Sequence, residues 1–116
     1  MRTTTKFRQL LQQPGIIQAP GAYDCLTAKL IQQAGFPAVY MTGAGTSVAQ
    51  LGYADLGLAT MSDMISNAGS IADFLDVPLI ADADTGYGGI LNVRRTIRQY
   101  ERAGVAAIHI EDQEMP

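Results

Sequence analysis

The sequence is short of several residue types, and each shortage excludes a class of protein. It has no tryptophan and one cysteine, Cys25, so no internal disulfide can form. No apolar run approaches the roughly 18 residues that a membrane span requires, and residues 1–15 lack the apolar centre of a secretory signal. The sequence has eight Lys and Arg and eleven Asp and Glu, and the basic residues form no patch, which argues against binding to nucleic acid. We therefore expect a cytoplasmic protein that binds neither membrane nor nucleic acid.

What the sequence does contain is a steady alternation of apolar strands and amphipathic helices. The predicted strands are residues 15–24, 37–45, 77–84 and 105–112. The predicted helices are residues 1–15, 24–36, 60–75 and 92–105, each with apolar residues three and four apart. No linker or low-complexity tract interrupts the alternation, which indicates a single domain.

Local signals predict where two of these helices begin. Asp24 is a candidate N-cap for the second helix, in which Leu26, Leu30 and Ile31 define the expected buried side. Thr60 and Asp63 have the spacing of a capping box at the start of the third helix.

The alternation of strands and helices predicts a parallel α/β sheet joined by right-handed crossovers. Each strand–helix unit takes about 30 residues, whereas a complete (β/α)8 barrel needs roughly 250. Residues 1–116 therefore correspond to the first four βα units, a single incomplete domain that forms half of a TIM barrel. An open, doubly wound sheet of four strands is the alternative.

Acidic residues stand where the predicted strands end. The stretch "PLIADADTGYGG" places Asp82 and Asp84 two residues apart, a spacing that puts side chains on the same side of a strand. Glu111 follows the fourth strand, and Asp55 lies in the loop after the second. Because parallel α/β folds carry their active sites at the carboxyl ends of the strands, these acids are candidate site residues.

The predicted edge holds several carboxylates and few cations. The lysine and arginines of the second and fourth helices face outward, and His109 is interpreted as an inward-facing, hydrogen-bonded strand residue. Crowded carboxylates require protonation, a basic partner or a metal ion. Oxygen ligands favour Mg²⁺ or Mn²⁺ over zinc. For each acid taken singly, helix capping or solvation is the alternative.

Two glycine-rich turns follow the second and third strands. In "TGAGTS" and "TGYGG" the bare backbone would let a ligand approach closely, and the first turn could bind a carboxylate through its N–H groups. "TGAGTS" is superficially like a dinucleotide fingerprint, but Val48 replaces the third glycine and we expect no helix to start at once. An ordinary turn is the alternative.

Three segments in order along the chain resemble one known superfamily. "YMTGAGTSVAQLGYADLG", "ADADTGYGG" and "AAIHIEDQ" are similar to the isocitrate lyase and phosphoenolpyruvate mutase superfamily, and above all to its 2-methylisocitrate lyase branch. The resemblance implies a Mg²⁺-dependent (β/α)8 barrel that cleaves 2-methylisocitrate-like or substituted malate acids through a metal-stabilised enolate. Pyruvate or a related 2-oxo acid would be released, and the full-length family implies a homo-oligomer, a tetramer.

The resemblance also implies roles for individual residues. Asp82 and Asp84 would hold Mg²⁺, with Mn²⁺ as a substitute, while Asp55 and Glu111 would act through water. Asp55 is the candidate catalytic residue present in the chain. The residues that would bind substrate are Tyr40, Thr42, Gly43, Ala44 and Asp82.

Lyases of this branch carry their acid–base cysteine on a mobile loop after "EDQ", where this sequence reaches Pro116. Cys25 belongs to a different motif, so we expect residues 1–116 alone to have low activity or none. A phosphonomutase or an oxaloacetate decarboxylase of the same superfamily is an alternative. A non-enzymatic half-barrel that self-associates through its unpaired sheet edges is another.

Overall fold

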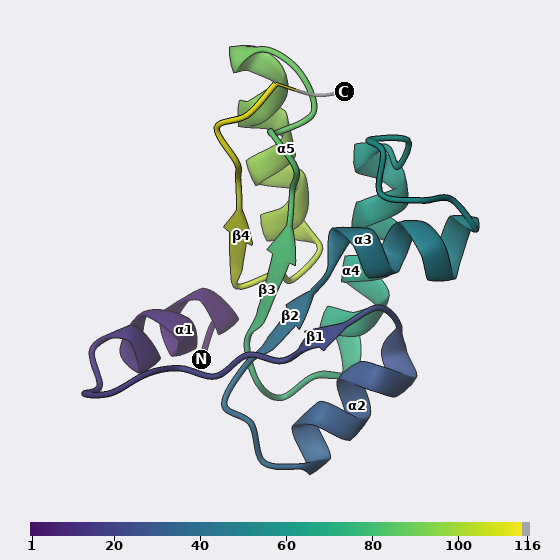
Figure 1. The fold of residues 1–116 in the computed structure, drawn as a ribbon. Coiled ribbons are helices and arrows are strands. Elements are labelled where there is room, and N and C mark those ends of the chain that lie inside the picture. Colours follow the sequence, from purple (N-terminus) through teal and green to yellow (C-terminus); the bar gives the residue numbers. More distant parts are fainter. Residues whose placement is uncertain (115–116) are drawn as a thin grey trace.

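The computed structural model describes residues 1–114, in which four parallel strands form one sheet (Figure 1). The strands are β1 (Gly21–Ala22), β2 (Val39–Met41), β3 (Leu79–Asp82) and β4 (Ala107–His109). Their order in the sheet is β1-β2-β3-β4, the same as in the sequence. A doubly wound sheet reverses its strand order at a switch point, so that alternative is wrong. The predicted α/β class with successive parallel βα units is confirmed.

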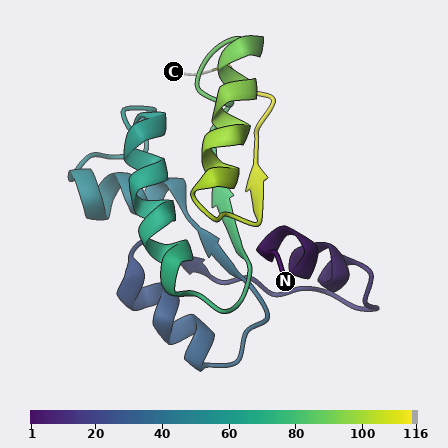
Figure 2. The same ribbon diagram turned by 180° about the vertical axis from the view of Figure 1, so that it is seen from behind.

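Helices cover one face of this sheet. The long ones are α1 (Thr3–Leu11), α2 (Cys25–Gln33), α4 (Met61–Phe74) and α5 (Ile90–Arg102). Figures 1 and 2 show α2, α4 and α5 together on one side, as right-handed crossovers require, and α1 apart from them beside the amino ends of β3 and β4. No helix among the described residues is long and apolar enough to cross a bilayer.

The core lies between the sheet and these helices. Side chains alternate along β3, so Leu79 and Ala81 are buried towards the helices while Ile80 and Asp82 face the other way and are half-buried. Met64 and Ile71 of α4 complete the core on the helical side. The opposite face of the sheet is therefore the one that carries polar groups.

Both predicted helix caps are confirmed. The Asp24 carboxylate accepts a hydrogen bond from Thr27 N at 2.8 Å, and Thr60 and Asp63 bond reciprocally in a capping box. Of the side predicted to be buried in α2, only Ile31 packs against the core, whereas Leu26 and Leu30 are 65% and 56% exposed. Ala28 is the buried residue, and its small side chain lets α2 lie close to the sheet.

Every observed strand is shorter than its predicted range, and two differences from the prediction have a clear physical reason. The first strand is limited to Gly21 and Ala22. Pro20 before it accepts a hydrogen bond from Tyr40 N at 3.0 Å but has no N–H to donate. A helix does begin directly after β2: α3 (Gly43–Thr46) continues into a π-helix, η1 (Ser47–Leu51). Thr42 caps α3 by accepting a hydrogen bond from Gly45 N at 3.1 Å, so the expectation of no immediate helix is wrong.

Candidate functional site

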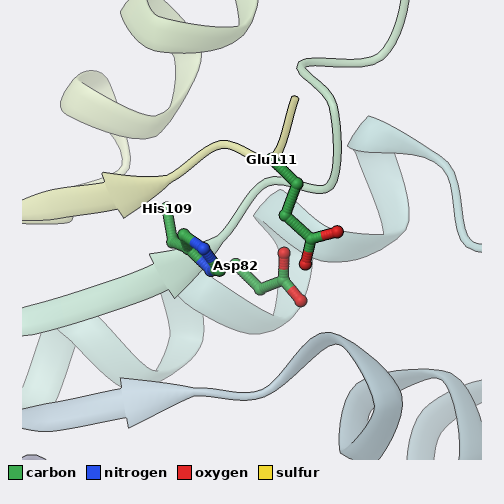
Figure 3. Close-up of side chains that lie close together, drawn as sticks. All are labelled: Asp82, His109 and Glu111. Atoms are coloured by element: carbon green, nitrogen blue, oxygen red, sulfur yellow. The ribbon is translucent and has the colours of Figure 1, made fainter. Parts of the chain in front are cut away.

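Two carboxylates and an imidazole meet at the carboxyl edge of the sheet. Asp82 ends β3 and is paired in register with His109 of β4, which puts both side chains on the same face. Glu111 lies two residues further along and returns to that face. One ligand atom from each residue lies within 4.8 Å of the others, and Figure 3 shows the three side chains converging. We refer to Asp82, His109 and Glu111 as the ligand group.

Asp84 is placed beside this group by a turn. β3 ends at Asp82, and the backbone of Asp84 adopts φ 45°, in the left-handed region. Asp84 N donates to Asp82 Oδ1 at 2.8 Å, and Asp84 O accepts from Glu111 N at 2.8 Å. The two aspartates are therefore neighbours through a hydrogen-bonded turn, and the strand alternation assumed from the sequence does not extend to Asp84.

Burial and neighbouring negative charge act together on Asp84. Burial, followed by the charges of Asp82, Asp55 and Glu111, raises the pKa of Asp84 to about 6. Asp55 is exposed and lies outside the ligand group, but it is close enough to act on Asp84 through its charge. A divalent cation at this edge would relieve the repulsion.

Tyr40 contacts the ligand group from β2. Its hydroxyl lies 3.2 Å from His109 Nδ1, and burial followed by the charges of Asp82 and Glu111 raises the pKa of Tyr40 to about 12. The phenol therefore keeps its proton at neutral pH. The predicted hydrogen bond of His109 is confirmed, although the side chain is exposed.

The sequence analysis missed His109 as a possible ligand. The signal that could have revealed it is the spacing of His109 and Glu111, two residues apart at the end of a strand.

The turn after β2 forms the wall against Asp82. Gly43 is buried, and a Cβ atom at this position would lie 2.9 Å from Asp82 Cγ, closer than side chains tolerate. Thr42 is half-buried and uses its hydroxyl to cap α3, while Ala44 is exposed. Gly43 therefore lies directly against the Asp82 carboxylate.

Residues 7–116 match the family model described as phosphoenolpyruvate phosphomutase. The chain belongs to this family. It is 53% identical over 116 residues to the 2,3-dimethylmalate lyase of Eubacterium barkeri, covering 100% of this chain and 40% of that one. It is 43% identical over 108 residues to the 2-methylisocitrate lyase of Shewanella oneidensis, covering 93% and 37%. The superfamily resemblance drawn from the three motifs is confirmed.

Solved structures of the phosphoenolpyruvate phosphomutase family agree with this fold. The crystal structure of a 2,3-dimethylmalate lyase matches with a TM-score of 0.92 at 52% identity, over 98% of this chain and 41% of that one. An oxaloacetate acetylhydrolase matches with a TM-score of 0.94 at 47% identity, over 98% and 41%. The chain spans about 40% of the length of such relatives, so its four βα units are a partial barrel.

The donor set fits a hard divalent cation. Carboxylate oxygens are preferred ligands of Mg²⁺ and Mn²⁺, and imidazole is a common metal ligand in its neutral form. A phosphonopyruvate hydrolase that matches with a TM-score of 0.93 at 36% identity, over 100% of this chain and 41% of that one, has been solved with oxalate and Mg²⁺. In this chain, Asp82, His109 and Glu111 form a group of side chains that could hold a metal ion.

Proposed function

We propose that this chain supplies the metal-binding part of a Mg²⁺-dependent carbon–carbon lyase that acts on a 2-methylisocitrate-like or substituted malate acid. The observation that carries the proposal is the ligand group, in which Asp82, His109 and Glu111 approach within 4.8 Å at the carboxyl edge of a parallel sheet. The 53% identity to a 2,3-dimethylmalate lyase supports a substituted malate as the substrate.

The proposed reaction breaks the bond between the hydroxyl-bearing carbon and its neighbour next to a carboxylate. The hydroxyl loses its proton and becomes the carbonyl of pyruvate or a related 2-oxo acid. The electron pair of the broken bond passes to the second acid as an enolate, which then takes up a proton. A bound Mg²⁺ or Mn²⁺ supplies positive charge that stabilises the developing negative oxygen.

The chain's own residues divide this work between them. Asp82 and Asp84 hold the ion, and Asp55 and Glu111 order its water, with Asp55 as the catalytic residue of this segment. We add His109 to the residues that hold the ion, because its imidazole lies within the ligand group. The substrate is bound by Tyr40, Thr42, Gly43, Ala44 and Asp82.

The proposed setting is that of the family. The partner is a small oxo acid or hydroxy polycarboxylate, the protein works in the cytoplasm, and the whole protein is a homo-oligomer, a tetramer. Residues 1–116 alone have low activity or none, because the acid–base cysteine of the lyases lies on a loop after the "EDQ" segment.

The test is a product assay on the whole protein. It is incubated with 2,3-dimethylmalate, 2-methylisocitrate or oxaloacetate, with Mg²⁺ or with a chelator, and the released acids are separated by chromatography. We expect pyruvate from one of the first two substrates, only with Mg²⁺, and loss of activity in Asp82→Asn. Absence of pyruvate from both substrates would contradict the proposal.

A second candidate is hydrolysis of the carbon–carbon bond of oxaloacetate. It is favoured by the TM-score of 0.94 to an oxaloacetate acetylhydrolase, a protein also solved with its product oxalate. Release of oxalate from oxaloacetate in the same assay, without pyruvate from the other two acids, would select this candidate.

A further inference from the structure

Helix α5 binds the segment that carries Asp82 and Asp84 through side-chain hydrogen bonds. We call residues 82–86 the acid loop. Tyr100 Oη donates to the carbonyl of Asp82 at 2.9 Å, and Thr96 Oγ1 donates to the carbonyl of Gly86 at 2.8 Å. Thr96 and Tyr100 are one helical turn apart and are 0% and 1% exposed. Two buried hydroxyls therefore bind the first and last carbonyls of the loop.

Backbone hydrogen bonds fix the middle of the acid loop. Ala83 N donates to His109 O at 3.0 Å, and Gly86 N donates to Ala83 O at 2.8 Å. Glu111 N donates to Asp84 O at 2.8 Å. The loop is thus bonded to His109 at the end of β4 and to Glu111 just beyond it, so a shift of the loop would change the distances within the ligand group.

The loop also depends on external support because of its conformation. Asp84 has φ 45° and Gly86 has φ 95°, both in the left-handed region that side chains disfavour. A Cβ atom at Gly86 would lie 2.6 Å from Val93 Cγ2 of α5, so helix and loop are in close contact there. Valine at position 96 and phenylalanine at position 100 would pack against the acid loop equally well. The two hydroxyls add hydrogen bonds aimed at the loop carbonyls, which packing alone does not require.

We propose that Thr96 and Tyr100 are positioning residues that set the geometry of the metal-binding group by holding the acid loop. A role of Thr96 and Tyr100 in catalysis rests on the proposed function, whereas their effect on the conformation of the acid loop does not. Neither residue touches the metal or the substrate in this role. Each acts through the carbonyl that it binds, in the way that outer hydrogen bonds orient metal ligands elsewhere.

The experiment removes each hydroxyl while keeping the shape of the side chain. Tyr100→Phe and Thr96→Val are prepared in the whole protein and titrated with Mn²⁺, with the affinity followed by electron paramagnetic resonance. We expect the dissociation constant for Mn²⁺ to rise roughly ten-fold in each variant. Thr96→Ser keeps the hydroxyl and should retain the original affinity.

A second readout needs no metal. Hydrogen exchange of the metal-free protein reports the Asp84 amide, which donates to Asp82 Oδ1, and the Gly86 amide, which donates to Ala83 O. We expect both amides to exchange faster in Tyr100→Phe and Thr96→Val. Thr27→Val is the matched control: it removes a hydroxyl from the capping box of α2, outside the acid loop, and should change neither amide exchange in the loop nor Mn²⁺ affinity.

The outcomes separate this inference from the proposed function. Folded variants that keep both the Mn²⁺ affinity and the amide protection would overturn it, even if the protein proves to be a lyase. Weaker Mn²⁺ binding and faster exchange in a protein that releases no pyruvate would support it while removing the lyase proposal.

Discussion

At the scale of single residues, position 43 requires glycine because the carboxylate of Asp82 lies against it. A Cβ atom there would lie 2.9 Å from Asp82 Cγ, so Gly43→Ala must displace the acid or the turn. We expect this variant to bind Mn²⁺ roughly ten-fold more weakly, because the displaced carboxylate no longer meets the other ligands. Calorimetric titration with Mn²⁺ measures the change.

Gly69 of α4 offers the matched control for Gly43. A Cβ at Gly69 meets only Ala103 Cβ, at an ordinary 3.7 Å. Gly69→Ala should leave Mn²⁺ affinity unchanged and raise the free energy of unfolding by about 0.5–1 kcal/mol, because alanine favours a helix interior. Equal loss of metal affinity in both variants would mean that Gly43 has no special relation to the site.

The raised pKa of Asp84 predicts how stability depends on pH. The pKa of this carboxyl is about 6 in the folded protein and its ordinary 3.8 when unfolded. Between these values the folded, metal-free state holds a proton that the unfolded state has released, so the free energy of unfolding falls as the pH rises. Urea denaturation without metal, repeated across this interval, measures the slope.

Metal affinity should rise with pH, whereas the free energy of unfolding of the metal-free protein falls. A cation competes with the proton on Asp84, so Mn²⁺ affinity is expected to fall as the pH drops below about 6. Asp84→Asn removes the titrating carboxyl and tolerates the same left-handed backbone, so both pH effects should flatten. A variant that keeps the full pH dependence would place the titration on another group.

At the scale of secondary structure, α4 depends on its first turn. Thr60 Oγ1 accepts from Asp63 N at 3.2 Å, and the Asp63 carboxylate accepts from Thr60 N at 2.9 Å. Thr60→Ala should lower the free energy of unfolding by about 1 kcal/mol, because an N–H at the helix start loses its partner. Urea denaturation measures the loss. Ser62→Ala, exposed in the same turn, should cause no loss, and similar costs in both variants would contradict the capping role.

At the scale of the whole molecule, a bound cation should stabilise the fold. An ion that binds only the folded state adds about 2.7 kcal/mol at a hundred times its dissociation constant. We expect the melting temperature to rise with Mg²⁺ and to return to its starting value with a chelator, as followed by calorimetry. Sodium chloride at equal ionic strength controls for screening of the acids. Asp82→Asn should melt at the same temperature with and without Mg²⁺, and a persistent shift would place the ion elsewhere.

The sequence by itself determined the features that depend on near neighbours. The four apolar runs and the patterns between them predicted the order of strands and helices, and Asp24 and Thr60 were correctly read as caps. Such signals act over a few residues, because capping joins groups three positions apart. The acids were also found from the sequence, since a carboxylate just after an apolar run stands at a strand end wherever the strand is placed.

Only the tertiary structure decided which of these groups meet. Asp82 and His109 are 27 positions apart, and the register of β3 with β4 makes them neighbours. Leu26 was misassigned to the core because the side of α2 that meets the sheet is chosen by packing. Asp84 lies outside β3 because the chain forms a turn there, which is bonded to Glu111 and to α5. Register and packing are contacts between distant segments, so a pattern of near neighbours cannot specify them.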